Sequence, residues 1–433
     1  MYKLTKEILD LLKKQYISVA GQKPFQNTTE AREYYLENLD DNLYKPMSPE
    51  IFREYENGSG NEISSGKMNS LRSSSALTYN LFWSGTASVS KNFFSGSLGL
   101  SPGKYTVEFE KRYHTLKPSV SNRPANLDAF LYNADNSEAI AVEVKMTEWI
   151  FNKPGNLKAA YLDESSYINE EAGKVFSSVA RSLIWSGDYE DPTDKKAEYP
   201  PFSTRYDAFQ MFKHAVGCYT ACVSEEKRPV KKITLLNILW KLPEIDKLSD
   251  ETQEIYYEID CEEQFEIRQF IKRMEPVKKL FADIGVDFSI KGTETDMAAY
   301  VFDFCDEEIN YLERYLGKAH IEQIKEYKNF DSNSTDTDMN AKRSEEGCEI
   351  SSPGYSKLYE MLQDIDIGEL VCEEGQVIGY CIQDIYNDCI KLKESRGFAV
   401  TETLDMFIPD LAKTMFWVNP EEELIKILKW ICK

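Results

Sequence analysis

The chain has 433 residues, of which 42% are hydrophobic, and a formal net charge of −22 at pH 7. This length exceeds one average domain, and the hydrophobic fraction is sufficient to build cores. No run approaches the roughly 20 apolar residues of a transmembrane helix, and the first segment, MYKLTKEILDLLKKQY, carries charges throughout, unlike a signal peptide. We therefore expect a cytoplasmic protein without a membrane segment.

The negative charge is concentrated in the C-terminal part of the chain. Residues 1–250 contain 31 Lys and Arg against 33 Asp and Glu, a net charge of −2, whereas residues 251–433 contain 20 against 40, a net charge of −20. Phosphate affinity depends on local Lys and Arg, so contacts with nucleic acid are expected in the N-terminal part. The acidic C-terminal part either contacts a partner protein or serves solubility.

The predicted elements in the first part follow the order helix, three strands, helix, strand. They are helix 68–83, strand 104–116, strands LDAFLYN (127–133) and EAIAVEVK (138–145), helix 205–223 and strand 231–241. The segment ADNS between the two middle strands favours a tight hairpin turn. This order predicts an α/β protein with a mixed sheet.

The chain is predicted to divide into four parts. The segment after residue 250 is helical with one strand near 286–290, whereas the segment 329–354 has almost no large apolar side chains and predicts a linker. The parts are a helical extension (1–66), an α/β domain (67–328) with an insertion (149–202), the linker (329–354) and an acidic helical domain (355–433).

A structural zinc site is not expected from the cysteines and histidines. The nine cysteines lack C-x-x-C spacing, and Cys218 and Cys222 alone share a helical face. The three histidines are His114, His214 and His320. Most of the thiols are therefore interpreted as small buried core residues.

Ionisable residues meet at the ends of the two middle strands. Glu143 and Lys145 are two residues apart, so both are expected on one face of the sheet, and Asp128 lies near the start of the adjoining strand. Two partly buried carboxylates repel each other unless a cation bridges them or one takes a proton. Mg²⁺ prefers oxygen ligands, and Asp128, Glu143 and the backbone carbonyl of Val144 are the expected protein ligands.

This pattern favours phosphodiester hydrolysis. Mg²⁺, or Mn²⁺ in its place, polarises a phosphodiester and lowers the pKa of a bound water, and Lys145 can orient that water or stabilise the developing charge. The alternative is a solvated strand end. The triplet E-x-K alone does not exclude it, because Glu225-Glu226-Lys227 and Glu326-Tyr327-Lys328 have the same form.

The combined motifs resemble a known superfamily. NLD (126–128) and VEVK (142–145), in this order of elements, are similar to the motifs of the PD-(D/E)XK nucleases, which include restriction enzymes and repair nucleases. RPANLDAFLYN, VEVKMTEWI and FQMFKHAVG resemble, more narrowly, a group of restriction-endonuclease-like bacterial proteins. The resemblance covers roughly residues 65–290 and implies a restriction-endonuclease-like mixed sheet flanked by helices.

The resemblance also implies roles for individual residues. Asp128 and Glu143 would be metal ligands, Lys145 the catalytic lysine, and Gln210 a glutamine directed at the active site. A fourth carboxylate often lies on the first helix, but helix 68–83 has none. Its expected substitute is Glu110 on the first strand, with Glu108 as the second choice.

The implied activity is metal-dependent cleavage of nucleic acid, with DNA as the first choice of substrate. The alternative is a catalytically inactive interaction protein that keeps the nuclease fold. Glu148 either belongs to the site as a supporting residue or caps the strand end. The candidates for phosphate contacts are Lys111, Arg112, Lys117, Lys213, His214, Lys227, Arg228, Lys231 and Lys232, and for His214 a place at a helix–sheet boundary is an equal alternative.

Overall fold

The computed structural model describes residues 2–26, 29, 32–58, 60–121, 123–151, 153–185, 197–224 and 230–333. The chain forms two compact units, Met1–Gly317 and Lys318–Lys433. In the second unit the described part is helix α12 (Lys318–Asn333). The predicted acidic helical domain, and the predicted linker from residue 334 onward, lie outside the described residues.

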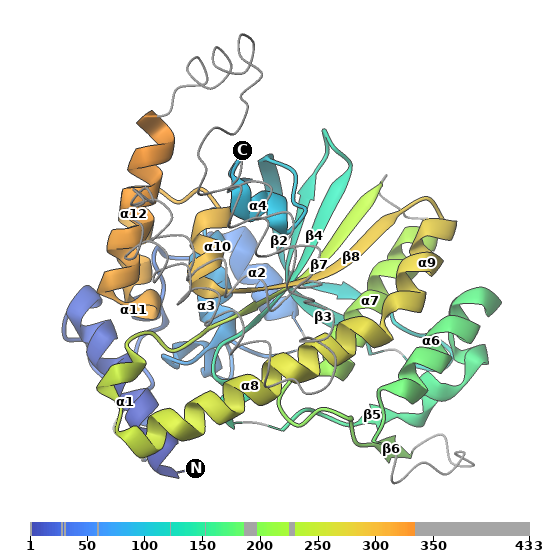
Figure 1. The fold of residues 1–433 in the computed structure, drawn as a ribbon, viewed down its shortest axis with the longest axis horizontal. Coiled ribbons are helices and arrows are strands. Elements are labelled where there is room, and N and C mark those ends of the chain that lie inside the picture. Colours follow the sequence, from blue (N-terminus) through green and yellow to red (C-terminus); the bar gives the residue numbers. More distant parts are fainter. Residues whose placement is uncertain are drawn as a thin grey trace, which may run out of the picture. The chain divides into compact units, whose positions relative to one another are not determined.

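A six-stranded mixed sheet runs through the first unit (Figure 1). The neighbours β1–β2, β2–β3 and β3–β4 are antiparallel pairs, whereas β4–β7 and β7–β8 are parallel pairs. The sheet order is β1 (Thr86–Val89), β2 (Gly103–Tyr113), β3 (Ala125–Asn133), β4 (Glu138–Lys145), β7 (Lys232–Leu239) and β8 (Asp287–Glu294). The predicted α/β class with a mixed sheet flanked by helices is thereby confirmed.

The β3–β4 hairpin forms as its sequence predicts. Its register pairs Asn133 with Glu138, and residues 134–137 make the turn, in which Ser137 has a left-handed φ of 53°. The Asn133 side chain accepts a hydrogen bond from the backbone N–H of Asn136 at 3.1 Å. Every β4 residue before Lys145 is buried, as expected for a strand between two neighbours and two covered faces.

Different helices cover the two faces of the sheet. Phe109 of β2 packs against Tyr55 of α2 (Pro49–Asn57) and Tyr79 of α3 (Ser74–Phe82), with ring centroids 5.4 and 6.0 Å away. Phe109 pairs with Ala129, which pairs with Val142, so α2 and α3 cover the Val142 face. Successive strand residues alternate between faces, and α7 (Ala208–Val223) contacts the opposite face, from which Glu143 and Lys145 project.

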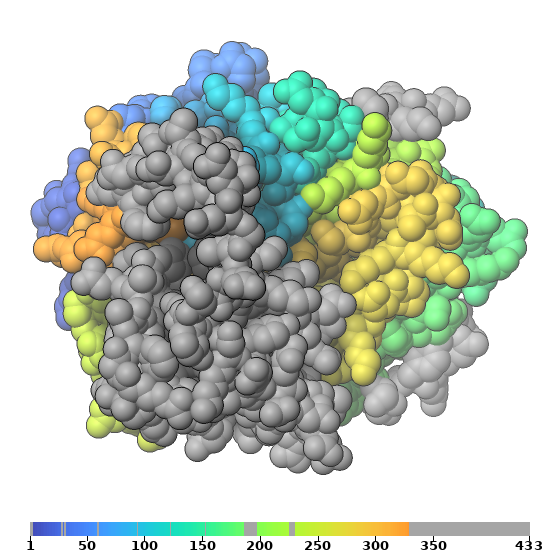
Figure 2. Space-filling model, turned by 45° about the horizontal axis from the view of Figure 1, so that its top comes forward, coloured from blue at the N-terminus to red at the C-terminus, as the bar shows by residue number. Residues whose placement is uncertain are grey.

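The remaining helices complete the first unit. Helix α1 contacts α8 and α11, so the N-terminal segment packs within this unit, and α6 lies beside α9 (Figures 1 and 2). Among the described residues, no helix is long and apolar enough to cross a membrane. The bounds are α1 (Tyr2–Ala20), α4 (Phe93–Ser97), α5 (Glu148–Phe151), α6 (Glu170–Ser182), α8 (Asp250–Arg273), α9 (Glu275–Asp283), α10 (Thr295–Val301) and α11 (Asp306–Leu316), with a two-stranded sheet of β5 (Leu157–Lys158) and β6 (Glu198–Tyr199).

Candidate active site

The carboxyl end of β4 presents Glu143 and Lys145 on one face of the sheet. Lys145 Nζ lies 2.8 Å from Glu143 Oε1, the Glu143 side chain is buried, and the Lys145 side chain is 18% exposed. Burial alone would lower the pKa of Lys145, but the carboxylates of Glu143 and Asp207 outweigh it and raise this pKa. The ammonium group therefore stays charged at the edge of the solvent.

Asp128 lies beside this pair on the neighbouring strand. Its Oδ2 accepts a hydrogen bond from the backbone N–H of Val144 at 2.8 Å. The N–H and carbonyl of one strand residue point to the same edge, so the Val144 carbonyl also faces Asp128. Burial and the negative charge of Glu143 both disfavour an ionised Asp128, so they raise the pKa of Asp128 well above its usual range.

The first turn of α7 connects the two charged residues of β4. Lys145 Nζ donates a hydrogen bond to Gln210 Oε1 at 2.6 Å, and Gln210 Nε2 donates to Glu143 Oε1 at 2.7 Å. Asp207 caps the helix by accepting a hydrogen bond from the Gln210 backbone N–H at 3.0 Å. Asp207 was not among the residues predicted from the sequence, although an aspartate three residues before a helical glutamine is a recognisable cap signal.

His214 lies one turn further along α7 and is buried against Glu143. His214 Nε2 is 2.9 Å from Glu143 Oε2, but the contact lacks the orientation of a hydrogen bond, so we treat it as electrostatic. Burial would raise the pKa of Glu143, yet Lys145 and His214 together lower it. His214 thus occupies the helix–sheet boundary. Lys213 lies elsewhere, with Nζ 5.9 Å from the centre of the Tyr161 ring.

On β2, Phe109 pairs with Ala129 of β3 and Lys111 pairs with Leu127, so Glu110 lies opposite Asp128. Its φ of 49° is left-handed, which is unusual for a residue other than glycine and frequent at functional sites. Asn126 Nδ2 donates a hydrogen bond to Glu110 Oε2 at 2.8 Å. Burial raises the pKa of Glu110 to about 7, and Glu143 contributes to this shift.

The other predicted residues have separate surroundings. Glu108 forms an ion pair with Lys111, and Glu148 Oε2 accepts a hydrogen bond from the Met146 backbone N–H at 2.7 Å, so Glu148 caps the end of β4. Lys117 Nζ donates to the carbonyl of Ser165 at 2.9 Å. In the remainder of the predicted set, Lys232 pairs with Glu138, Arg112 is exposed, Lys231 is exposed, and Lys227 and Arg228 lie outside the described residues.

The acidic residues of the site fit a hard cation held partly by water. Asp128, Glu143 and Glu110 interact electrostatically, since Glu143 and Glu110 both raise the pKa of Asp128. Glu143 Oε2 is buried without a hydrogen-bond partner. Among the described residues, no three His, Cys, Asp or Glu side chains converge into a ready metal cage. Mg²⁺ commonly needs only one or two carboxylates plus waters and substrate phosphate, so this donor set is compatible with it.

A pocket of about 220 Å³ opens beside Lys145 at the carboxyl ends of β4 and β7. Asp207 and Arg205 line it from the segment that leads into α7, and Glu263 lines it from α8. In α/β sheets the carboxyl ends of parallel strands are the usual place of ligand sites. Lys145 is thus reachable from solvent through this pocket.

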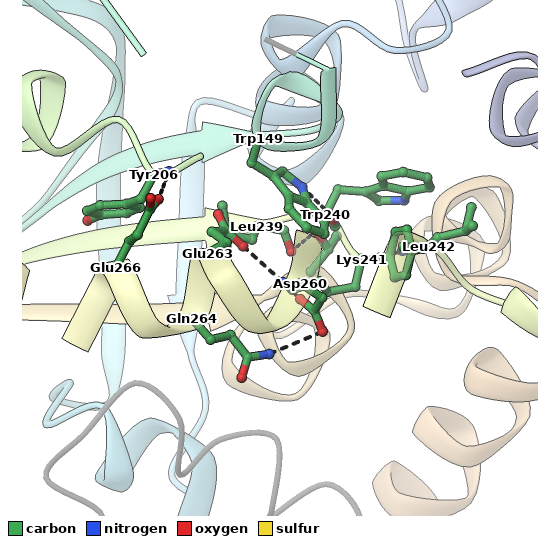
Figure 3. A network of polar contacts seen from close by, with 12 residues as sticks. Trp149, Tyr206, Leu239, Trp240, Lys241, Leu242, Asp260, Glu263, Gln264 and Glu266 are labelled. Carbon is green, nitrogen blue, oxygen red and sulfur yellow. Dashed lines mark hydrogen bonds and ion pairs between the residues drawn. The ribbon is translucent and has the colours of Figure 1, made fainter. Parts of the chain in front are cut away.

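A second cluster of charges includes Glu263, which lines this pocket (Figure 3). Lys241 Nζ pairs with Asp260 and lies 3.1 Å from Glu263 Oε2, and the Trp149 ring centre is 4.0 Å away. On helix α8, which carries Asp260 and Glu263, Glu266 Oε2 accepts a hydrogen bond from the backbone N–H of Tyr206 at 2.8 Å. Helix α8 therefore fixes the segment that leads into α7 and so supports the position of Gln210.

Comparisons with protein-family models, with curated proteins and with solved structures find no match to this chain. Three of the predicted residues, Glu143, Lys145 and Gln210, form one contact network, and Asp128 joins it through the Val144 backbone. Glu110 is placed opposite Asp128 but directs Oε2 toward Asn126.

Proposed function

We propose that this protein hydrolyses phosphodiester bonds of nucleic acid in a Mg²⁺-dependent reaction, with a restriction-endonuclease-like fold. The observation that carries the proposal is the network of Lys145 with Glu143 and Gln210, beside the partly exposed Asp128. The order of α3, β2, β3, β4, α7 and β7, with β4 parallel to β7, supports the same proposal.

The residues divide the chemical tasks among them. Asp128, Glu143 and the Val144 carbonyl would hold the metal ion, which supplies charge neutralisation at the phosphate and activation of water. Lys145 has three N–H donors, of which Glu143 and Gln210 take two. The third donor is left for a phosphate oxygen or for the attacking water. Gln210 holds the ammonium and the carboxylate in one orientation.

The protein also controls ionisation at this place. The pKa of Glu143 is lowered and that of Lys145 is raised, so both stay charged at neutral pH. Asp128 has the opposite tendency, because burial and Glu143 favour its protonated form. Asp128 and Glu143 would hold a divalent cation, whose positive charge would offset this conflict. Metal binding is therefore expected to release a proton from Asp128.

The test is cleavage by purified protein with Mg²⁺ or Mn²⁺, offered single-stranded DNA, duplex DNA and RNA. Lys145→Met and Asp128→Asn are expected to lower the rate by about 10²–10³-fold, as for loss of one group that stabilises transition-state charge. Glu326→Gln is the matched control, because Glu326-Tyr327-Lys328 has the same spacing on α12, where Glu326 is exposed. EDTA should abolish cleavage.

A metal titration without nucleic acid gives an independent readout. Mn²⁺ is expected to raise the melting temperature of the wild type and to have no such effect on Asp128→Asn, because ligands stabilise only the state that binds them. Cleavage of equal rate in all variants would indicate a contaminating nuclease. Absence of both cleavage and metal binding would contradict the proposal and favour an inactive interaction protein with Asp128 and Glu143 in structural roles.

A further inference from the structure

A groove of about 740 Å³ lies between the end of β2 and the second half of α7. Two of its lining residues lie close in sequence to residues of the candidate site. Lys111, which follows Glu110 directly on β2, lines the groove, and so does Cys218, which lies one helical turn beyond His214. A chain bound in this groove would therefore continue toward Glu110 and the β4 end.

The charge of the groove differs from that of the chain. Among the described residues that line it, none is Asp or Glu, although the full chain carries a net charge of −22. Its ionisable side chains besides cysteine and tyrosine are Lys111, Arg112 and His114 at the end of β2. Lys111 is paired with Glu108, whereas the Arg112 side chain is exposed. Among the described lining residues, an anionic ligand thus finds the exposed Arg112 guanidinium and no carboxylate.

The interior of the groove is apolar and aromatic. Tyr113 and Phe130 meet edge to face with ring centroids 5.8 Å apart, and both line the groove with Ile168, Val223 and Val230. A duplex turns its phosphates and sugars outward and keeps its bases stacked, so it cannot use such an interior. A single strand can insert an unstacked base against aromatic rings while its phosphate meets a cation.

We propose that this groove binds single-stranded nucleic acid, with a base against Tyr113 and a phosphate at Arg112. The inference rests on the proposed nuclease function, since it names the form of substrate that the same site would receive. Substrates with a single-stranded segment are then preferred over blunt duplexes. The polar Thr220 and Ser224 hydroxyl groups at the end of α7 supply further partners for bases or phosphates.

The experiment measures binding rather than cleavage. Fluorescence anisotropy of a labelled oligothymidylate is recorded with the full chain carrying Lys145→Met, in EDTA, beside the same strand annealed to its complement. The single strand is expected to bind at least about tenfold more tightly than the duplex. Arg112→Glu should weaken single-strand binding about tenfold or more and should lower the slope of log K against log salt by about 1.

The controls separate charge, stacking and folding. Lys104→Glu reverses an exposed cation at the other end of β2, outside the groove, and should leave binding unchanged. Tyr113→Leu should weaken binding about 5-fold to 100-fold if a base stacks on the ring. Circular dichroism checks that this variant folds, because Tyr113 packs closely on Gly217. Arg112 is exposed, so its variant carries the test if Tyr113→Leu does not fold.

Two results would overturn the groove proposal. One is duplex binding as tight as single-strand binding, and the other is equal binding by Arg112→Glu and Lys104→Glu, which would leave an apolar partner as the better occupant. The two proposals fail separately. Single-strand binding without any metal-dependent cleavage would refute the nuclease function alone, whereas cleavage that prefers duplex and ignores Arg112 would refute the groove alone.

Discussion

Two clusters of lysine and buried glutamate lie at the carboxyl ends of the neighbouring strands β4 and β7. In the first, Lys145 pairs with Glu143, and in the second, Lys241 pairs with Glu263. Each glutamate has one buried oxygen without a hydrogen-bond partner, and Lys145 and Glu263 line the same pocket. The two clusters are therefore alike in composition and in depth.

They differ in the protonation that the surroundings favour. Lys145 and His214 lower the pKa of Glu143 despite its burial. At Glu263, burial and the negative charge of Asp260 outweigh the effect of Lys241 and raise the pKa to about 7. Glu143 in the first cluster therefore stays ionised beside Asp128. The second, in which one cation serves two acids, joins α8 to the segment after β7 (Figure 3). We infer that the first cluster binds a ligand, whereas the second cluster stabilises the fold.

The largest expected effect tests the structural role of the second cluster. Lys241→Ala leaves the buried Glu263 and the partly buried Asp260 without their cation, and it is expected to lower the free energy of unfolding by about 3–5 kcal/mol. Urea unfolding followed by circular dichroism measures this change. Lys174→Ala, which removes an exposed ion pair with Glu170 on α6, should cause no resolvable loss. A Lys241 variant as stable as the wild type would remove the distinction between the clusters.

A smaller effect is expected at the glutamine that supports the first cluster. Gln210→Ala removes the bridge between Lys145 and Glu143 without removing either charge, so activity or metal affinity should fall about 10-fold to 100-fold, as for other residues that orient metal ligands. The readout is the Mn²⁺ concentration for half-maximal cleavage together with the maximal rate. Gln323→Ala on α12, where Gln323 is exposed, is the control. Unchanged values for Gln210→Ala would show that Lys145 and Glu143 orient each other unaided.

The sequence allowed the first cluster to be predicted and not the second. Side chains alternate along a strand, so Glu143 and Lys145, two apart on a recognisable strand, had to share a face. Lys241, Asp260 and Glu263 belong to separate elements, and their meeting depends on how α8 crosses the end of the sheet. No local hydrophobic period in the sequence indicates how α8 crosses the end of the sheet. The same triplet spacing at Glu326 and Lys328 lies on a helix, which shows that spacing alone does not define a site.

The backbone conformation of Glu110 also could not be predicted from the sequence. The sequence predicted a strand at 104–116, and β2 spans Gly103–Tyr113 with the alternating residues Tyr105, Val107 and Phe109 buried. The left-handed φ of Glu110 interrupts that alternation, and nothing in its neighbours indicates it. In contrast, the order of helices and strands around β3 and β4 follows from hydrophobic periods and turn residues. Local patterns therefore predicted elements, whereas long-range packing determined how their charges meet.

The smallest expected effect concerns the pH dependence of stability. A folded-state pKa of about 7 for Glu263, against an ordinary value of 4.5, means that the folded protein binds more protons than the unfolded chain between these values. The contribution of Glu263 to the free energy of unfolding should therefore fall as pH rises from about 4.5 to about 7. Glu263→Gln cannot ionise, so the difference in stability between about pH 5 and pH 8 should be smaller than in the wild type. Urea unfolding at both values measures this, with Glu258→Gln, an exposed position on the same helix, as the control. A wild-type difference equal to that of Glu263→Gln would mean that Lys241 neutralises Glu263 as fully as Lys145 neutralises Glu143, and the contrast between a ligand-holding and a fold-holding cluster would then rest on Asp128 alone.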